Sequence, residues 1–194
     1  MNLGPGERPL VVAIAGPNGA GKSTFYETQL RNSGLPFINA DNLARQLQID
    51  PYKAASAADA IRRKLAHQRA SFVFETVFSD PVGDKVAFLR ELEDASYRVI
   101  LCFIGISSAA VSEQRVAIRV SRGGHDVPSQ KIAQRYARTL ANLKLSIEQL
   151  SDVRVFDNDD MAHPYRLAAH CDHGHLVTLN KPVPAWLRPL LPRA

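Results

Sequence analysis

The segment GPNGAGKS, residues 16–23, constrains this chain more than any other feature of the sequence. It follows an uninterrupted apolar run, PLVVAIA (9–15), which is typical of a strand buried on both faces of a parallel sheet. Residues 23–31, which come next, have a helix-forming pattern. A G-x-x-x-x-G-K-S sequence between a buried strand and a helix lets backbone N–H groups surround phosphate oxygens. The segment therefore predicts a P-loop.

Each type of residue in this loop has its own expected task in binding a nucleoside triphosphate, for which we expect ATP. Glycines let the loop fold around the phosphates, and Lys22 brings a positive charge to the β and γ phosphates. The Ser23 hydroxyl is the expected ligand of Mg²⁺. The expected ATP-binding residues are Gly16, Pro17, Asn18, Gly19, Ala20, Gly21, Lys22, Ser23 and Thr24.

Strand-like and helix-like segments alternate along the whole sequence. Strands are expected at residues 9–15, 35–39, 71–75, 97–105 and 153–156. Helices are expected at residues 23–31, 41–47, 52–70, 81–94, 108–122, 129–150 and 164–170, with a hairpin-like His173-Gly174 after the last. The alternation predicts one α/β domain over residues 1–194, with a mostly parallel sheet covered by helices on both faces. A proline-rich tail is expected over residues 182–194.

Composition excludes several classes of protein. With 45% hydrophobic and 22% charged residues, the chain resembles an ordinary globular domain, and no run approaches the ~18 apolar residues of a membrane span. The first ten residues carry no basic region followed by an apolar one, so we expect a cytoplasmic protein with Cys102 and Cys171 as reduced thiols. A net charge of +5 favours an anionic ligand, but this excess is small for a nucleic-acid partner, which we do not expect.

A P-loop alone leaves kinases, switches and motors open. A GTPase should carry an Asn-Lys-x-Asp motif that recognises guanine, and NKPV (180–183) lacks the aspartate. A transporter-type ATPase should carry an LSGGQ-like signature, which SRGGH (121–125) does not match. A single-domain kinase of a small molecule is therefore the leading hypothesis.

Acidic residues follow two of the expected strands, where the carboxyl ends of parallel strands line a ligand crevice. Asp41 could accept the proton of a substrate hydroxyl or bind Mg²⁺ waters, or it could only cap the helix that begins at Asn42. Glu75 could hold a substrate hydroxyl or amide, act like the acid of a Walker B strand, or be a solvated strand-end residue. Thr76 could share either task.

Several segments, taken together with the P-loop, carry a resemblance to one family. They are GPNGAGKST (16–24), INADNLAR (38–45), FVFET (72–76), RVAIRVSRGGHDVP (115–128), RYAR (135–138) and FDN (156–158). In this order they resemble the zeta toxin family of P-loop kinases, and within it the short, zeta-like predicted ATPases. The motifs span nearly the whole expected domain, and the GGHDVP block is far more specific than the P-loop.

The resemblance implies ATP-dependent phosphorylation of a hydroxyl on a UDP-activated amino sugar, classically UDP-N-acetylglucosamine. It implies that Asp41 is the catalytic base and that Glu75 binds the sugar end of this substrate. Val77 stands where many relatives carry a second Thr after the Glu, which weakens the transfer of substrate contacts at that point. The resemblance also implies a small helical antitoxin as a partner that blocks the nucleotide site, although no segment of this sequence reveals one.

The family further implies a helical lid, here over residues 107–150, whose arginines clamp the transferring phosphate. The candidates are Arg115, Arg119, Arg122 and Arg135, of which we favour Arg119 and Arg135. A planar guanidinium can meet two phosphate oxygens at once, which is the chemical reason for arginine there. His125 could touch the nucleotide or cap the next helix. The same basic residues could instead form only a solvated helix face.

Two other functions remain open. A polynucleotide or nucleoside kinase shares the P-loop, base and arginine lid, whereas an ATP-gated binding module would have no need of the base at Asp41. The cluster HCDHGH (170–175) lacks paired ligands from a second segment, so we interpret it as a polar turn rather than a zinc site. Trp186 is expected to pack the tail onto the domain.

Overall fold

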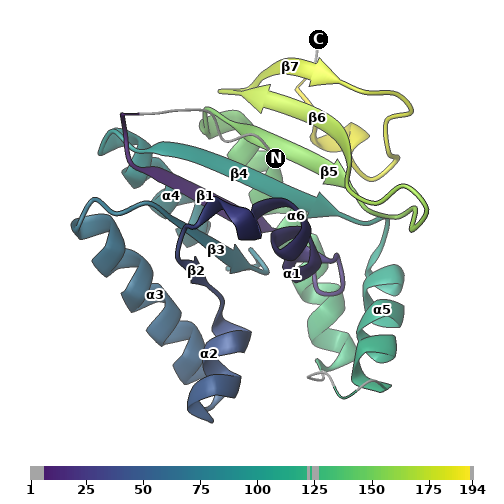
Figure 1. Cartoon of the computed structure of the whole chain (residues 1–194). Coiled ribbons are helices and arrows are strands. Elements are labelled where there is room, and N and C mark those ends of the chain that lie inside the picture. The colour runs from purple at the N-terminus through teal and green to yellow at the C-terminus, as the bar shows by residue number, and fades with distance from the viewer. Residues whose placement is uncertain (1–6, 122, 124–126, 193–194) are drawn as a thin grey trace.

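The computed structural model describes residues 7–121, 123 and 127–192. Within them, one sheet has the strand order β2-β3-β1-β4-β5-β6-β7 (Figure 1). Its strands are β1 (Leu10–Ala15), β2 (Phe37–Ile38), β3 (Phe72–Thr76), β4 (Arg98–Gly105), β5 (Val153–Asp157), β6 (Arg166–Asp172) and β7 (His175–Leu179). The strands from β2 to β5 in this order pair in parallel, whereas β6 and β7 are antiparallel. The predicted, mostly parallel sheet is confirmed.

Helices follow the parallel strands. They are α1 (Lys22–Phe25), α2 (Ala40–Leu47), α3 (Pro51–His67), α4 (Asp84–Asp94), α5 (Ala109–Ser121) and α6 (Ser129–Gln149). The π-helical η1 (Tyr26–Leu30) and the 3-10 helices η2 (Arg31–Ser33) and η3 (Arg188–Leu190) complete the order. Among the described residues, no helix is both long enough and apolar enough to cross a membrane.

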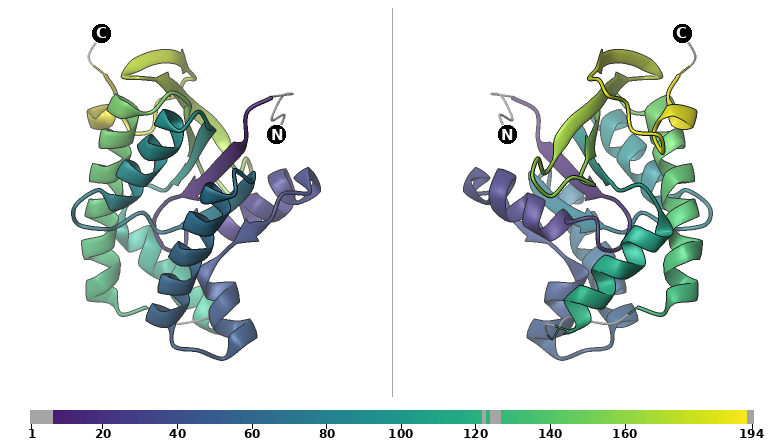
Figure 2. Two further views of the ribbon diagram at one scale, coloured as in Figure 1. Left: turned by 90° about the vertical axis from the view of Figure 1, so that its left-hand side faces the viewer. Right: turned by 90° about the vertical axis from the view of Figure 1, so that its right-hand side faces the viewer.

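Alternate residues of the parallel strands enter two separate hydrophobic cores, one on each face of the sheet. In β1, Val11 and Ala13 belong to one core, and Val12 and Ile14 belong to the other. Side chains of α3, α4 and α6 close the first core, and side chains of α1 and η1 close the second. Figure 2 shows helices on both sides of the sheet. The predicted single α/β domain with helices on both faces is confirmed.

The helix expected at residues 164–170 is wrong, because most of this segment forms β6. That strand pairs with β5 on one side and with β7 on the other. Ala168 and Ala169 favour a helix by intrinsic propensity, but hydrogen bonding to two neighbouring strands outweighs this local preference. The predicted turn at His173-Gly174 is confirmed, and it joins β6 to β7.

Smaller differences concern the ends of helices. The helix expected at residues 23–31 is present, but only its first turn is α-helical before the π-helical η1. α4 begins at Asp84 rather than near Pro81, because Gly83 precedes it in the left-handed conformation with φ of +79°. Of the two serines that could cap α5, Ser107 and Ser108, the hydroxyl of Ser108 accepts a hydrogen bond of 3.2 Å from the amide of Val111.

The tail after β7 returns to the sheet through Trp186, as predicted. Its indole is 7% exposed and packs on β4, where a Cβ added to Gly105 would lie 2.1 Å from the ring. The indole nitrogen also donates a hydrogen bond to Asp157 at 3.4 Å. Cys102 and Cys171 are buried in β4 and β6, and both are free thiols.

Candidate functional site

The P-loop connects β1 to α1 and lies at the carboxyl end of the parallel strands. Gly19 and Gly21 adopt left-handed backbone conformations, with φ of +73° and +92°. A Cβ at Gly21 would lie 2.7 Å from Asn158 and 3.0 Å from Tyr165, so neither the backbone angle nor the space suits another residue. The loop therefore has a fixed shape, with α1 beginning directly after it.

Three side chains from distant segments hold the P-loop through its carbonyl groups. The hydroxyl of Ser112 donates to the carbonyl oxygen of Asn18 at 2.5 Å, and the amide of Asn158 donates to that of Ala20 at 2.8 Å. The hydroxyl of Tyr165 donates to the carbonyl oxygen of Gly21 at 2.9 Å. These three bonds occupy carbonyl groups of the loop and none of its N–H groups, which is compatible with anion binding by those N–H groups.

Lys22 is almost fully buried between the P-loop and β3. Its ammonium group donates to the carbonyl oxygen of Pro17 at 3.0 Å and lies 3.9 Å from the carboxylate of Glu75. Burial lowers the pKa of Lys22, and the nearby Glu75 and Asp41 carboxylates oppose this effect while Arg119 adds to it. These electrostatic effects place an acid of α2 and an arginine of α5 near the P-loop lysine.

Glu75 is the penultimate residue of β3 and binds both Ser23 and Asn39 through one carboxylate oxygen. The Ser23 hydroxyl donates to Oε2 at 2.8 Å, and the side-chain amide of Asn39 donates to the same oxygen at 2.7 Å. Glu75 is therefore not a solvated strand-end acid. It contacts the predicted Mg²⁺ ligand directly, which is the position expected of an acid on a Walker B strand.

Asp41 lies in the first turn of α2 and is exposed to solvent at the edge of the cleft described below. The alternative that Asp41 only caps this helix is wrong. The capping residue is Asn39, whose side-chain oxygen accepts the amide hydrogen of Asn42 at 3.0 Å. The strand ends one residue earlier than the sequence pattern indicated, which moves the capping position and leaves the Asp41 carboxylate without that structural task.

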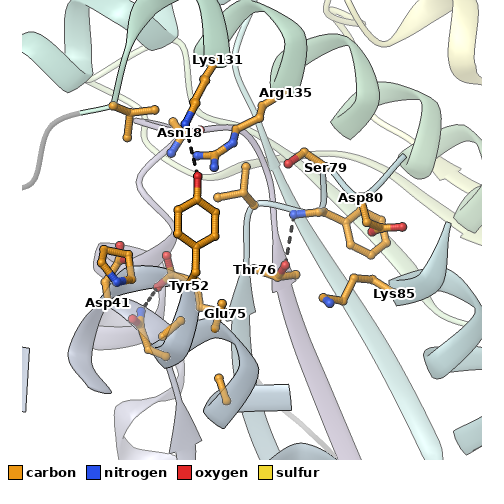
Figure 3. A pocket seen from close by; sticks show the side chains of 18 of the residues that line it. Asn18, Asp41, Tyr52, Glu75, Thr76, Ser79, Asp80, Lys85, Lys131 and Arg135 are labelled. Carbon is orange, nitrogen blue, oxygen red and sulfur yellow. Dashed lines mark hydrogen bonds between the residues drawn. The ribbon is translucent and has the colours of Figure 1, made fainter. Parts of the chain in front are cut away.

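A cleft of about 450 Å³, which we name the central cleft, runs from the P-loop between α3 and α6 (Figure 3). Its lining residues are Asn18, Asn39, Ala40, Asp41, Pro51, Tyr52, Ala55, Ala58, Asp59, Arg62, Glu75, Thr76, Val77, Phe78, Ser79, Asp80, Lys85, Arg119, Val127, Pro128, Lys131 and Arg135. The structure thus brings together Asp41, Glu75 and Thr76 with the favoured arginines Arg119 and Arg135. A volume of this size accommodates a metabolite-sized ligand.

The predicted lid arginines separate into different groups. Arg119 of α5 and Arg135 of α6 line the central cleft, and Figure 3 shows Arg135 reaching into it from the side opposite Asp41. Arg115 instead donates to the carbonyl oxygen of Asp159 at 3.1 Å and packs against Gly19 of the P-loop. Arg122 and His125 lie outside the described residues.

Charged side chains gather along another wall of the cleft, in a group that we name the Asp59 cluster (Asp59, Arg62, Asp80 and Lys85). Arg62 and Lys85 bind the same oxygen of Asp59, and the Lys85 contact measures 3.2 Å. Burial, followed by the neighbouring Arg63, lowers the pKa of Arg62 to about 10. Oδ1 of Asp80 is buried and accepts no hydrogen bond from the described part of the chain. The cluster therefore offers donors and an acceptor to a polar ligand.

The residues present fit an ATP molecule with its metal ion. The P-loop provides the anion site, and Oδ1 of Asn18 beside it is buried without a hydrogen-bond partner among residues 7–121, 123 and 127–192. Ser23 supplies one hydroxyl ligand and Glu75 a carboxylate behind it. The described residues hold no group of three metal-ligating side chains, so the phosphates would have to provide other ligands to Mg²⁺.

Comparison with protein families agrees with this geometry. A family model described as "AAA domain" matches residues 11–143, which is more than half of the chain. The chain belongs to the AAA domain family. The match begins in β1 and ends within α6, so the P-loop, β3, α5 and the part of α6 that carries Arg135 lie inside the AAA domain. A comparison with curated proteins finds no match.

Solved structures share the fold of this AAA domain at low sequence identity. A chain of the native AvrRxo1-ORF1:AvrRxo1-ORF2 complex has a TM-score of 0.73 at 17% identity, covering 96% of this chain and 65% of its own. The same complex is known with ATP. A chain of the PezAT toxin–antitoxin system of Streptococcus pneumoniae has a TM-score of 0.60 at 14% identity, covering 96% and 78%. A kinase-like protein from Chloroflexus aurantiacus has a TM-score of 0.52 at 17% identity, covering 69% and 79%.

Several site residues escaped the sequence interpretation. Asn39 was visible only as part of INADNLAR. Tyr52, Asp59 and Arg62 lie on α3, which the sequence showed only as an amphipathic helix. Asn158 was quoted in FDN, yet its bond to the P-loop depends on the sheet order that places β5 nearby. In the HCDHGH segment, Cys171 is buried in β6 and His170 lies 3.1 Å from Asp152. These side chains therefore make contacts around β5 and β6 and take no part in the candidate site.

Proposed function

We propose that this AAA domain is a zeta-toxin-like kinase that transfers the γ-phosphate of ATP to a hydroxyl of a small metabolite. The acceptor that the sequence resemblance favours is a UDP-activated amino sugar such as UDP-N-acetylglucosamine. The observation that carries the proposal is the position of Asp41: it lines the central cleft, and its negative charge opposes the lowering of the pKa of Lys22 by burial. An acid that lines an open cleft near a P-loop lysine suits proton removal from an acceptor hydroxyl.

In this function, the acceptor hydroxyl lies in the central cleft and gives its proton to Asp41. The hydroxyl oxygen forms a bond to the γ-phosphorus as the bond to the leaving oxygen of ADP breaks. Lys22, Arg119 and Arg135 offset the negative charge that spreads over the phosphoryl oxygens. Ser23 would hold Mg²⁺, which would supply further charge neutralisation when bound.

The remainder of the cleft supports an acceptor larger than a simple sugar. The cleft wall on α3 runs from Tyr52 to Arg62, and ten residues of helix span about 15 Å at the usual rise per residue. Tyr52 offers an exposed aromatic ring at one end of this wall. At the other end, the Asp59 cluster offers cations for an anionic group and carboxylates for hydroxyl groups. An aromatic, anionic and hydroxyl-bearing acceptor such as a UDP-sugar matches these surfaces.

Transfer from γ-labelled ATP to separate acceptor pools tests this function. The pools are UDP-sugars, neutral sugars, nucleosides and oligonucleotides with free 5′-hydroxyls, and Asp41→Asn serves as the matched variant. We expect label in the UDP-sugar pool with the wild type and far less with the variant. Label in the nucleoside or oligonucleotide pool would establish the alternative kinase. ATP binding without label in any pool would support the ATP-gated module instead.

A toxin role is a separate part of the proposal. The fold is shared with a chain of the PezAT toxin–antitoxin system, and the resemblance to zeta toxins implies a small helical antitoxin that covers the nucleotide site. Expression of the wild type and of Lys22→Ala in bacterial cells tests it. Growth arrest by the wild type alone supports a toxin, whereas harmless expression of an active kinase favours a housekeeping or effector enzyme.

A further inference from the structure

The carboxylate of Glu75 joins two parts of the site that are distant in the sequence. On one side, it accepts a hydrogen bond of 2.8 Å from the hydroxyl of Ser23 in α1. On the other side, the same oxygen accepts a hydrogen bond of 2.7 Å from the side-chain amide of Asn39, the residue that precedes α2. One carboxylate therefore connects the predicted metal ligand to the start of the helix that carries Asp41.

Asn39 is suited to this connection because both ends of its amide are engaged. Its oxygen accepts the backbone hydrogen of Asn42 at 3.0 Å, while its nitrogen donates to Glu75. A backbone N–H can only donate and an ionised carboxylate can only accept, so these partners fix which end of the amide is which. The side chain is 5% exposed, and a buried amide with both ends paired has one favourable orientation.

α2 has little contact with the hydrophobic core. None of its residues is fully buried, and only Ala40 and Leu43 pack on the core from a partly buried position. It packs mainly against α3, and the hydrogen bonds of Asn39 connect its N-terminal end to β3. Asp41 stands two residues after Asn39 in the first turn, so the place of its carboxylate follows from the orientation of Asn39.

We propose that Asn39 is a positioning residue that couples the metal–nucleotide site to Asp41. The coupling runs from Ser23 through Glu75 to Asn39 and so to the first turn of α2. A serine hydroxyl can offer a lone pair to a cation while its O–H donates a hydrogen bond to a carboxylate, so the chain of hydrogen bonds is compatible with Ser23 as a ligand. The catalytic meaning of the coupling rests on the proposed kinase function, whereas the anchoring of α2 is a property of the protein alone.

Replacement of Asn39 by serine tests the anchor, because serine retains the cap but its shorter side chain has no amide to reach Glu75. The matched control is Asn42→Ser in the same helix. In the protein without nucleotide, hydrogen exchange of the Ala40–Leu47 amides should accelerate in Asn39→Ser and stay at the wild-type rate in the control. Equal exchange in all three proteins would overturn the anchoring role.

Kinetics tests the coupling to Asp41. Misplacement of a catalytic group by about 1 Å can cost on the order of 100-fold in rate, so we expect Asn39→Ser to lower kcat at least ~10-fold. The KM for ATP should stay within about twofold, because the P-loop contacts are untouched. A rise in the KM for ATP with unchanged kcat would contradict positioning and indicate general damage to the nucleotide site.

A pair of compensating substitutions at Asn39 and Glu75 distinguishes a positioning role from a loss of folding. Asn39→Asp places two carboxylates together, whereas Asn39→Asp combined with Glu75→Gln restores one donor and one acceptor with reversed polarity. Protection of the α2 amides should fall in the single variant and return in the double variant. If the wild type phosphorylates no acceptor, the proposed function fails, but this exchange measurement still decides whether Asn39 and Glu75 form the anchor. A double variant no better protected than Asn39→Asp would overturn it.

Discussion

Lys131 of α6 and Tyr52 of α3 meet across the central cleft. The ammonium group donates a hydrogen bond of 3.2 Å to the phenol oxygen and lies 5.9 Å from the centre of the ring (Figure 3). This contact joins the wall that carries the Asp59 cluster to the helix that carries Arg135. Movement of α6 relative to α3 therefore has to break or form it.

Lys131→Met should impair binding of an anionic acceptor without destabilising the protein. An exposed contact of this kind contributes only about 0–1 kcal/mol to the free energy of unfolding. We expect a several-fold higher KM for a phosphorylated acceptor and an unchanged KM for ATP. Tyr52→Phe, which keeps the ring, is the matched control and should leave both values near those of the wild type. Equal increases in both KM values would instead place Lys131 at the nucleotide.

Arg119 and Arg135 should carry much of the rate. In phosphoryl transfer an arginine clamp can contribute about 10³-fold or more, so Arg119→Ala and Arg135→Ala should each lower kcat heavily while the protein stays folded. Arg138→Ala is the control, because Arg138 is exposed on the same helix and does not line the cleft. The measurement is steady-state kcat of the wild type and of the three variants. Activity preserved in both cleft variants would mean that these residues form only a solvated face.

The proposed lid predicts a response of α5 and α6 to ligand. If these helices close on the phosphates, ATP with Mg²⁺ should slow hydrogen exchange over residues 107–150 more than over residues 86–94 of α4, which do not line the cleft. The measurement compares wild type with Lys22→Ala at the same ATP concentration. Unchanged exchange over the lid in the wild type would exclude closure.

The parts of this protein that were predictable are those specified by local sequence. The P-loop lies between a strand and a helix, and short sequence patterns predict both. Successive side chains of β1 point to opposite faces of the sheet, which places Val11 and Val12 in opposite cores. The resemblance to the family implied the lid arginines, and although spacing alone could not choose among the four candidates, the favoured Arg119 and Arg135 both line the cleft. In these regions local propensity and tertiary packing agree.

The parts that were missed depend on contacts between distant segments. Glu75 and Asn39 meet only because β3 lies between β1 and β2 in the sheet, an order that no local pattern states. Asp41 and Asn39 both have side chains that can cap a helix. Because β2 ends at Ile38, Asn39 is the residue that caps α2. β6 looked helical because alanine favours a helix when a segment is considered without its neighbours. In each case a contact with a segment distant in the sequence determines the local structure.

Lys22→Met should abolish transfer and leave stability nearly unchanged. Burial lowers the pKa of Lys22, which means that holding a charged amine there opposes folding at every pH below its folded pKa. Methionine removes this cost, while Glu75 keeps its bonds to Ser23 and Asn39. We expect a free energy of unfolding within about 1 kcal/mol of the wild type. Chemical denaturation checks the stability, and a loss above about 3 kcal/mol would show that Lys22 is a structural ion-pair partner.

The two thiols should give the protein a stability that declines in alkali. Burial raises the pKa of Cys102 to about 12 and that of Cys171 to about 11. Because these folded pKa values exceed that of an unfolded thiol, the contribution is complete below about pH 8 and is lost as the pH rises from roughly 9 toward 12. A thiol reagent at pH 8 should therefore label the cysteines only in denaturant. Rapid labelling of the native protein would contradict the buried positions.

Asp41→Asn is the most direct examination of the proposed chemistry. The substitution keeps the size of an exposed side chain that has no capping task, so the fold and α2 should be unaffected. Loss of a positioned base costs about 10² to 10⁴-fold, so we expect at least ~100-fold lower kcat. ATP affinity should stay close to the wild-type value, because Asp41 does not belong to the P-loop. Asp94→Asn, an exposed change at the end of α4, is the control. A loss of less than about threefold in kcat, against the range expected for general base catalysis, would remove Asp41 from the mechanism.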